Sequence, residues 1–233
     1  MTSEWISYWN REDLFRDESF RKSMDIFIRA STPLLRYAPE DVVLDIGAGP
    51  GYLAVHLKDQ VKEIHCLEAS EKYLRVGQDR LRNEKNVFFH LLRADYTDVS
   101  FLRDRRFTIV ICKSVIQYYR SVDEVDALIE NVRKIAAPGC RFLIADIPGN
   151  AGWLADIWGV LRGGYRAGFL KESLLFFLRA RMSEYYRLRS SAGLLTLSRR
   201  QLEQLISRLA LRADILDLPL TYVENRKHLL IHF

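Results

Sequence analysis

Three acidic residues follow three successive apolar runs of this chain, and their type and placement suit them to binding a ligand. Asp45 lies near the end of the run 42–46, Glu68 ends the run 64–67, and Asp95 follows the run 87–91. Short apolar runs are typical of strands buried in a parallel sheet. Ligands of open α/β sheets bind where the carboxyl ends of the strands meet, so we expect the three carboxylates to face one ligand. Taken singly, Glu68 is also consistent with a solvated strand end, and Asp95 with an Asx turn.

A glycine-rich turn, Gly47-Ala48-Gly49-Pro50-Gly51, follows the first run. Glycine permits unusual backbone angles and close approach of a ligand, and free amides at a helix start attract anions. The spacing is G-x-G-x-G, and Tyr52 stands where the dinucleotide-binding fingerprint G-x-G-x-x-G requires glycine. The turn therefore favours a ligand with an anionic group and disfavours a nicotinamide dinucleotide.

The elements that position these residues alternate between strand and helix along the chain. This alternation predicts a single α/β domain over residues 1–233, with a Rossmann-like parallel sheet covered by helices on both faces. We expect seven strands, at 42–46, 64–68, 87–91, 107–112, 141–145, 212–218 and 227–233. A short loop joins the last two, and short loops join antiparallel neighbours, so the last strand should be antiparallel.

Local signals mark several element ends. Ser70 is a candidate N-cap, and capping boxes are expected at Ser121-Val122-Asp123-Glu124 and Ser198-Arg199-Arg200-Gln201. Pro138-Gly139 is expected to end the connection before the fifth strand.

With these features in place, the chain resembles the class I S-adenosylmethionine (SAM)-dependent methyltransferases, particularly the group that modifies small molecules. The resemblance covers about residues 41–148 and the strand pair at the end. It rests on these segments: VLDIGAGPGYLA at 43–54, CLEAS at 66–70, RADYTD at 93–98, ICKSVIQYY at 111–119 and AAPGCRFLIADIP at 136–148.

The resemblance implies SAM as cofactor and S-adenosylhomocysteine (SAH) as product. It implies that Asp45 faces the ammonium group of the cofactor, Glu68 the ribose and Asp95 the adenine. Lys113 and Ser114 should border the methionine part, and Gln117, Tyr118 and Tyr119 should lie near the reactive methyl. The expected cofactor-binding set is Asp45, Gly47, Ala48, Gly49, Gly51, Glu68, Ala69, Asp95, Tyr96, Lys113, Ser114 and Tyr8. The chain lacks the paired carboxylates or histidine ligands of the metal-dependent catechol type, so no metal is expected.

Methyl transfer from a sulfonium needs alignment and desolvation, and a general base only for a weak nucleophile. No histidine stands at an obvious catalytic edge: four are expected in strands and one on the first helix after the glycine turn. No catalytic residue is therefore assigned from the sequence. Tyr118, Tyr119 and Tyr222 are candidates for contacting the acceptor, or for packing only.

Two segments outside the sheet are candidates for closing the site. Residues 1–40 are expected to form a helical lid, with Tyr8 or Trp9 over SAM, or else a staple that packs on the domain. Residues 149–197 are expected to form a helical cap after the fifth strand. From Gly149 to Arg200 the chain holds nine basic and three acidic residues among many aromatic ones. The cap is consistent with binding an anionic or lipophilic small molecule, with resting on an anionic membrane, or with a basic helical layer or homodimer contact.

Composition limits the remaining alternatives. The net charge is +5, and no apolar run approaches the roughly 20 residues of a membrane-spanning helix. The N-terminal residues do not resemble a secretory signal, and the three separated cysteines favour reduced core residues, so a cytoplasmic protein is expected. Nucleic acid is disfavoured because the basic excess is local. A lipid or nucleic-acid methyltransferase and a non-catalytic SAM- or SAH-binding protein remain the alternatives to small-molecule methylation.

Overall fold

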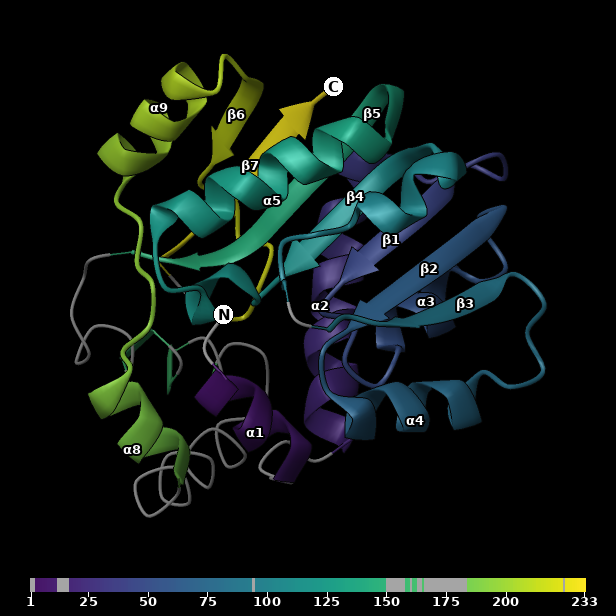
Figure 1. Cartoon of the computed structure of the whole chain (residues 1–233), viewed down its shortest axis with the longest axis horizontal. Coiled ribbons are helices and arrows are strands. Elements are labelled where there is room, and N and C mark those ends of the chain that lie inside the picture. The colour runs from purple at the N-terminus through teal and green to yellow at the C-terminus, as the bar shows by residue number, and fades with distance from the viewer. Residues whose placement is uncertain are drawn as a thin grey trace.

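The strands of this protein form one seven-stranded sheet in the order β3-β2-β1-β4-β5-β7-β6 (Figure 1). The structure, a computed structural model, describes residues 3–11, 17–93, 95–149, 158–159, 161–162, 165, 184–223 and 225–233. The strands are β1 (Val42–Ile46), β2 (Glu63–Glu68), β3 (Val87–Leu91), β4 (Phe107–Lys113), β5 (Ala136–Pro148), β6 (Arg212–Leu216) and β7 (Arg226–His232).

Helices alternate with the first five strands and then precede the final pair. The described α-helices are α1 (Ser3–Arg11), α2 (Asp17–Leu35), α3 (Tyr52–Leu57), α4 (Glu71–Arg80), α5 (Val122–Ile135), α8 (Glu184–Ser191) and α9 (Arg199–Arg208). Two short 3₁₀ helices, η1 (Ser100–Arg105) and η2 (Ile116–Tyr118), flank β4. The order of elements is the one expected from the alternation of apolar patterns.

The direction of the strands confirms the predicted topology. β1 pairs in parallel with β2 and β4, and the parallel pairing continues outward to β3 and β5. β7 runs antiparallel to both β5 and β6. The carboxyl ends of β1, β2, β4 and β5 therefore meet at one edge of the sheet, where a single ligand can reach all four.

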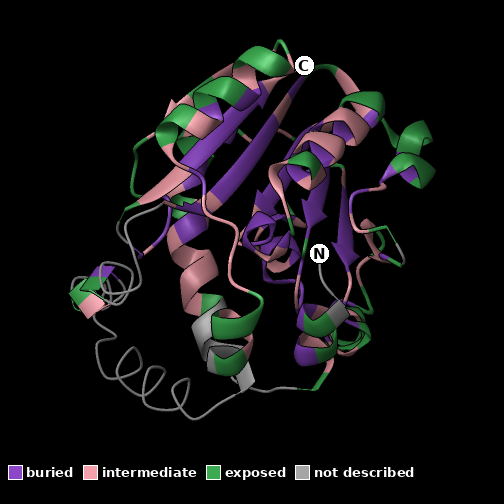
Figure 2. Cartoon of the chain, turned by 60° about the vertical axis from the view of Figure 1, so that its left-hand side comes forward, coloured by how far each residue is buried: buried purple, intermediate pink, exposed green. Residues whose placement is uncertain are grey.

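Two apolar cores lie on opposite faces of the sheet, because successive side chains of a strand point to opposite faces. Leu44 packs with α5 and α9 on one face, whereas its neighbour Val43 packs with α2 and α3 on the other. Figure 2 shows the strands as the buried layer between exposed helix faces. Burial on both faces explains why β1 and β4 read as continuous apolar runs.

Two local predictions are wrong. β5 begins at Ala136, not at 141, because Ala136 still pairs with Phe107 and the amide of Gly139 donates to the carbonyl of Phe233 at 2.7 Å. Ser121 precedes α5 but makes no side-chain cap; the carboxylate of Glu124 instead accepts from the amide of Arg120 at 3.0 Å. The caps at Ser70 and Ser198 are confirmed, the latter as a full capping box.

The two segments expected to close the site are described to different extents. α1 lies below the carboxyl ends of the strands and contacts α4 and α8 (Figure 1). Most of the expected cap, including 150–157 and 166–183, falls outside the described residues. In the part of the chain that the structure describes, no helix combines the length and apolarity needed to cross a bilayer.

Candidate functional site

A cavity of about 280 Å³ opens at the carboxyl edge of the sheet. The ends of β1, β2, β4 and β5 contribute to its wall, and so do α1, α2 and the loop before β7. Of the expected site residues, the cavity is lined by Asp45, Gly47, Ala48, Gly49, Glu68, Ala69, Tyr96, Lys113, Ser114, Gln117, Tyr118, Tyr119 and Tyr222. The sheet edge therefore brings together most of the residues that the sequence singled out.

Asp45 is the most electrostatically strained group in this cavity. Its side chain is buried, and its Oδ2 atom has no hydrogen-bond partner. Burial, followed by the nearby charge of Glu68, raises the pKa of Asp45 to about 7, against the opposing effect of Lys113. A buried carboxylate oxygen that faces a cavity without a partner is suited to a cationic hydrogen-bond donor.

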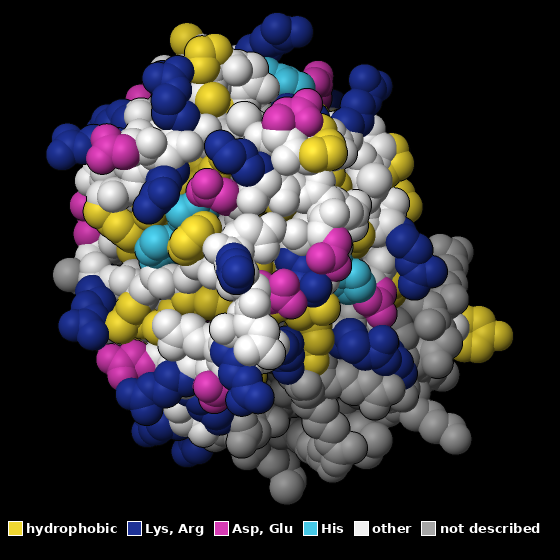
Figure 3. Space-filling view, turned by 90° about the vertical axis from the view of Figure 1, so that its right-hand side faces the viewer, with side chains coloured by type: hydrophobic (Ala, Val, Ile, Leu, Met, Phe, Trp, Pro, Cys, Tyr) yellow, Lys and Arg dark blue, Asp and Glu magenta, His cyan; other side chains and the backbone are white. Residues whose placement is uncertain are grey.

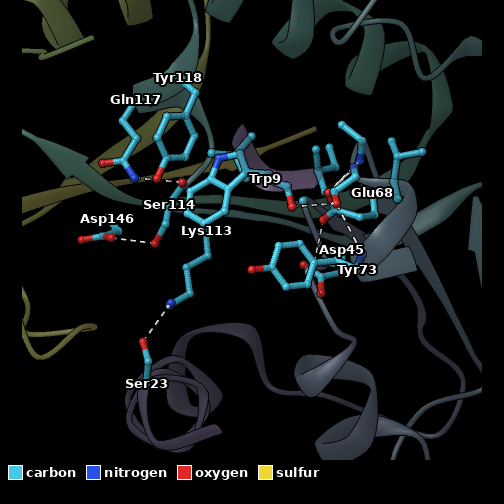
Figure 4. A pocket seen from close by; sticks show the side chains of 18 of the residues that line it. Trp9, Ser23, Asp45, Glu68, Tyr73, Lys113, Ser114, Gln117, Tyr118 and Asp146 are labelled. Atoms are coloured by element: carbon cyan, nitrogen blue, oxygen red, sulfur yellow. Dashed lines mark hydrogen bonds between the residues drawn. The ribbon is translucent and has the colours of Figure 1, made fainter. Parts of the chain in front are cut away.

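Glu68 joins the glycine turn to the end of β2. Its Oε2 accepts from the amide of Gly49 at 2.7 Å, and its Oε1 accepts from the amides of Ala69 and Ser70 at 2.8 and 2.7 Å (Figure 4). Burial raises the pKa of Glu68, and these three donors oppose that rise. Because a carboxylate offers about four lone-pair sites, roughly one remains for a ligand hydroxyl.

The amides of the glycine turn are not free, contrary to expectation. Gly47 and Ala48 donate to the carbonyl of Leu67 at 2.8 and 3.1 Å, and Gly51 donates to the carbonyl of Ala48 at 3.1 Å. Together with the bond from Gly49 to Glu68, these contacts use the donors that were expected to hold an anion. The turn thus shapes the cavity floor, and an anionic group of the ligand needs another partner.

The three glycines of the turn have different neighbours. All three adopt positive φ angles, of 75°, 54° and 80° for Gly47, Gly49 and Gly51. A Cβ atom at Gly47 would lie 2.2 Å from the Val115 side chain, whereas one at Gly49 would meet nothing within 4 Å. Gly51 does not line the cavity and instead faces Phe89. Only Gly49 therefore leaves open space through which a ligand can approach the backbone.

Lys113 places a partly buried cation between the two halves of the cavity. Its Nζ donates to the hydroxyl of Ser23 on α2 at 3.2 Å and lies 5.8 Å from the ring centre of Phe27 (Figure 4). Burial lowers the pKa of Lys113, while Asp146 and Asp45 raise it. This ammonium is a candidate partner for the anionic group that the glycine turn cannot hold.

Aromatic side chains from α1 and η2 close one side of the cavity. Trp9 lines it and packs edge-on against Tyr118 with ring centres 5.6 Å apart. Tyr8, the expected cofactor contact, is fully buried against Trp5 and does not line the cavity. The helical phase of α1 therefore turns Trp9, rather than Tyr8, toward the site.

Asp95 is placed differently from Asp45 and Glu68. Its Oδ1 accepts from the amide and the hydroxyl of Thr97, both at 2.8 Å, which is an Asx turn. It is exposed and does not line the cavity, whereas its neighbour Tyr96 does. The buried hydroxyl of Tyr119 donates to the carbonyl of Tyr96 at 3.0 Å, so Tyr119 fixes this loop.

A second polar cluster lies across the cavity from Glu68 and was missed by the sequence analysis (Figure 4). The hydroxyl of Ser114 donates to Oδ2 of Asp146 at 2.6 Å, and Arg226 and Thr221 lie 3.4 Å from Oδ1. Asp146 follows the apolar run of β5, so the rule that selected Asp45 and Glu68 could have found it. Nothing local marks Thr221 or Arg226, which the chain brings in from the loop before β7.

No group of three or more His, Cys, Asp or Glu side chains suited to a metal ion occurs within the described ranges. All three cysteines are free and buried. The five histidines lie where expected, four in strands and His56 on α3.

Comparison with known proteins assigns the central part of the chain. Residues 43–139 match the family model described as a methyltransferase domain. This part of the chain is a methyltransferase domain. A SAM-dependent methyltransferase from Leishmania major shares the fold, with a TM-score of 0.64 and 12% identity over 97% of this chain and 80% of that chain.

Two curated sequences match part of this chain. It is 28% identical over 117 residues to the chondramide synthase of Chondromyces crocatus, and 31% identical over 127 residues to a probable nonribosomal peptide synthetase of Salinispora arenicola. The matches cover 49% and 51% of this chain but only 3% and 2% of those proteins. The chain therefore spans a small fraction of the length of these relatives.

The residues around the cavity fit SAM. The unpartnered Oδ2 of Asp45 suits its ammonium group, and the open space above Gly49 suits a ligand that passes close to the backbone. Lys113 adds a cation beside the same cavity for a carboxylate. The donor set therefore agrees with a zwitterionic amino-acid group joined to a nucleoside.

Proposed function

We propose that this chain transfers the methyl group of SAM to a small-molecule acceptor that is anionic or lipophilic, by in-line displacement. The supporting observation is that one cavity has two separate polar walls. Asp45 and Glu68 stand on one wall, and Asp146 and Ser114 on the other. A transferase for two substrates needs such a division, because each substrate must be oriented before the reaction.

In this proposal, residues of β1, β2 and β4 hold the cofactor. Asp45 binds the ammonium group, Glu68 accepts one ribose hydroxyl, and Lys113 faces the carboxylate. Tyr96 packs beside the adenine, and Asp95, which does not line the cavity, is given no contact with the cofactor. Ala48 and Gly49 line the floor, while Gly47, Gly51 and Tyr8 support the site from outside the ligand.

The protein's contribution to the reaction is alignment and exclusion of water. SAM supplies an activated methyl group on a sulfonium centre. Trp9 and Tyr118 cover the cavity and keep the reacting groups dry, which strengthens electrostatic contacts within it. Tyr119 holds the loop at Tyr96 through its hydroxyl and so acts by packing rather than by contact with the acceptor.

The acceptor class is inferred from the side chains available around the second wall. Besides Lys113, which faces the cofactor in this proposal, the described lining includes two cations, Arg189 and Arg226, together with aromatic residues such as Tyr222. Cations favour an anionic group on the acceptor, and the aromatic rings favour an apolar part. A single domain over residues 1–233, a cytoplasmic location and a homodimer stay predictions within this proposal.

Peptide acceptors are a second candidate. The similarity of about half of this chain to segments of a chondramide synthase and of a probable nonribosomal peptide synthetase favours them. An amino-acid or peptide carboxylate would suit the same cations.

Methyl-labelled SAM tests the proposal. The protein is incubated with extract of its source, and lipid, nucleic-acid, protein and small-molecule fractions are separated. We expect label in the small-molecule fraction with wild-type protein and with Asp214→Asn, a variant of an exposed residue on β6. Asp45→Asn should lose the label. Label in the lipid or nucleic-acid fraction would contradict the proposed acceptor class, and failure of wild-type protein to bind SAH would contradict the function.

A further inference from the structure

The carboxylate of Asp146 stands at a distortion of the sheet. The register of β5 against β7 shifts between Ile144 and Ile147, so Asp146 lies in a bulge. Its φ angle is 66°, and Ser114, at the end of the neighbouring strand β4, has a φ angle of 61°. Positive φ angles are uncommon for residues other than glycine, and such strain persists where the surroundings enforce it, often at binding sites. Bulges likewise re-aim side chains beside active sites.

The surroundings that hold Asp146 come from distant parts of the chain. Its backbone amide donates to Nδ1 of His228 on β7 at 3.1 Å. His228 is 1% exposed, and burial lowers its pKa to about 4, so the ring is neutral and Nδ1 accepts this bond. The amide of Ser114 donates to the carbonyl of Ala145 at 3.0 Å. These bonds fix the backbone and direct the Asp146 side chain into the cavity.

The two carboxylate oxygens of Asp146 are used unequally. Oδ2 accepts the short bond of 2.6 Å from Ser114. Oδ1 has only two long contacts, each of 3.4 Å, to Thr221 and Arg226. Strong charge-assisted bonds to a carboxylate are about 2.7–2.9 Å long, so Oδ1 retains capacity for a closer donor. The side chain of Asp146 lines the cavity and is 13% exposed, so a donor within the cavity can reach it.

Asp146 also differs in position from the acids assigned to the cofactor. Asp45 and Glu68 lie at the ends of β1 and β2, whereas Asp146 lies near the end of β5, on the far side of Lys113 in the close view (Figure 4). Across the sheet, β4 separates β1 from β5. A ligand held by Asp45 and Glu68 would therefore present its reactive end toward Asp146.

From this geometry we infer that Asp146 is an acceptor-binding residue. Oδ1 accepts a hydrogen bond from the N–H or O–H of the group to be methylated, which orients its lone pair toward the methyl. Ser114 positions this carboxylate directly, and His228 positions it through the backbone. The acceptor is thus a nucleophile that carries a hydrogen, such as an amine or a hydroxyl compound. This inference rests on the proposed function.

Sinefungin tests the inference without knowledge of the acceptor. In this SAM analogue, a carbon bearing a primary amine replaces the methyl-bearing sulfur, so its ammonium lies where the methyl would be. SAH lacks that group but shares the rest. The ratio of the dissociation constants of sinefungin and SAH therefore reports on the residues around the reactive position. Calorimetry measures the two dissociation constants.

We expect Asp146→Asn to weaken sinefungin binding about tenfold relative to SAH, the usual effect of losing one charge-assisted hydrogen bond. Asn tolerates positive φ angles, so the fold is retained, and unchanged SAH affinity checks this. Ser114→Gly, which also suits a positive φ, should shift the ratio less but in the same direction. Asp214→Asn, on the exposed part of β6, is the matched control and should leave the ratio unchanged.

Two outcomes would overturn the inference. If Asp146→Asn weakens the binding of sinefungin and SAH equally, or changes neither, the ratio of their dissociation constants stays the same and Asp146 does not face the reactive position. If wild-type protein binds neither ligand, the proposed function fails, and this inference fails with it. The SAH measurement on wild-type protein separates the two cases.

Discussion

At the scale of single residues, the site combines groups that are unfavourable in the free protein. Asp45 is buried with an unpartnered oxygen, and Asp146 and Ser114 hold backbone angles that side chains disfavour. The unpartnered oxygen and the positive φ angles each lower stability by themselves, and a ligand donor relieves the first. Asp45 and Asp146, which are proposed to bind, are thus among the groups that lower the stability of the free protein.

Asp45→Asn should change the pH dependence of the free energy of unfolding and that of SAH binding in opposite directions. The pKa of Asp45 is raised from 3.8 to about 7, so its favourable contribution is present below pH 4 and is lost as pH rises through 7. The wild-type free energy of unfolding should fall by roughly 2–4 kcal/mol between pH 4 and pH 8 relative to Asp45→Asn. Chemical denaturation of both proteins across this range measures the difference.

SAH binding should show the opposite dependence on pH. The ligand's ammonium group favours the ionised carboxylate, so wild-type affinity should rise between pH 5 and pH 8. Asp45→Asn should bind SAH at least about tenfold more weakly at pH 8. Equal pH profiles for the two proteins would exclude Asp45 as the partner of that group.

Alanine at two positions of the glycine turn should have different effects. Gly47→Ala places a Cβ atom 2.2 Å from Val115 and should destabilise the fold by about 2 kcal/mol or more. Gly49→Ala meets no protein atom and bears only the strain of its φ angle of 54°, about 1 kcal/mol. Its Cβ atom should instead reduce SAH affinity. Thermal unfolding measures the stability of both variants, and calorimetry measures their SAH affinity. A larger loss of stability in Gly49→Ala than in Gly47→Ala would contradict this prediction.

At the scale of elements, short segments at the carboxyl edge decide what the cavity contains. α1 is nine residues long, and its packing against α4 and α8 carries Trp9 to the cavity. The amide of Leu195, just beyond α8, donates to the carbonyl of Gln117 at 2.8 Å, which ties this connection to η2. α1 is therefore held by α4 and α8, which lie beside the elements that form the site.

The phase of α1 can be tested by comparing two of its aromatic residues. Trp9→Ala should weaken SAH binding about tenfold, because a large ring that covers the cavity is lost. Tyr8→Phe should change SAH affinity by less than about threefold, because Tyr8 faces the protein interior. The reverse ranking in calorimetric titrations would show that Tyr8 is the residue over the cofactor.

At the scale of the whole molecule, one face of the described surface carries mixed charge. On the face shown in Figure 3, Lys and Arg side chains lie among Asp and Glu side chains rather than in one continuous patch. A nucleic-acid-binding face is expected to be a basic stripe or patch. The ligand-binding chemistry of the described residues is concentrated instead in the cavity at the sheet edge.

Binding of the cofactor product should stabilise the whole fold. At an SAH concentration of about 100 times its dissociation constant, linkage predicts about 2.7 kcal/mol of added stability. For a chain of this size, that corresponds to a rise in Tm of roughly 5–10 °C. Differential scanning fluorimetry measures it, and Asp45→Asn should show little rise at the same SAH concentration. A similar rise in both proteins would mean that SAH binds elsewhere.

The sequence by itself determined the sheet and the place of the site. The central strands β1, β2 and β4 are short runs buried on both faces, and a parallel sheet brings Asp45 and Glu68 to one edge whatever the details of packing. The antiparallel last strand followed from the length of a single loop. These features depend on local pattern and chain connectivity, both of which can be read from neighbouring residues.

Only the tertiary structure decided which groups around the site are available. The carbonyl of Leu67 takes the amides of Gly47 and Ala48, and a local turn draws Asp95 away from the cavity. His228, 82 residues along the chain, holds the bulge that aims Asp146. Hydrogen-bond satisfaction and side-chain direction depend on partners that are distant in sequence, and those partners are known only once the strands have paired.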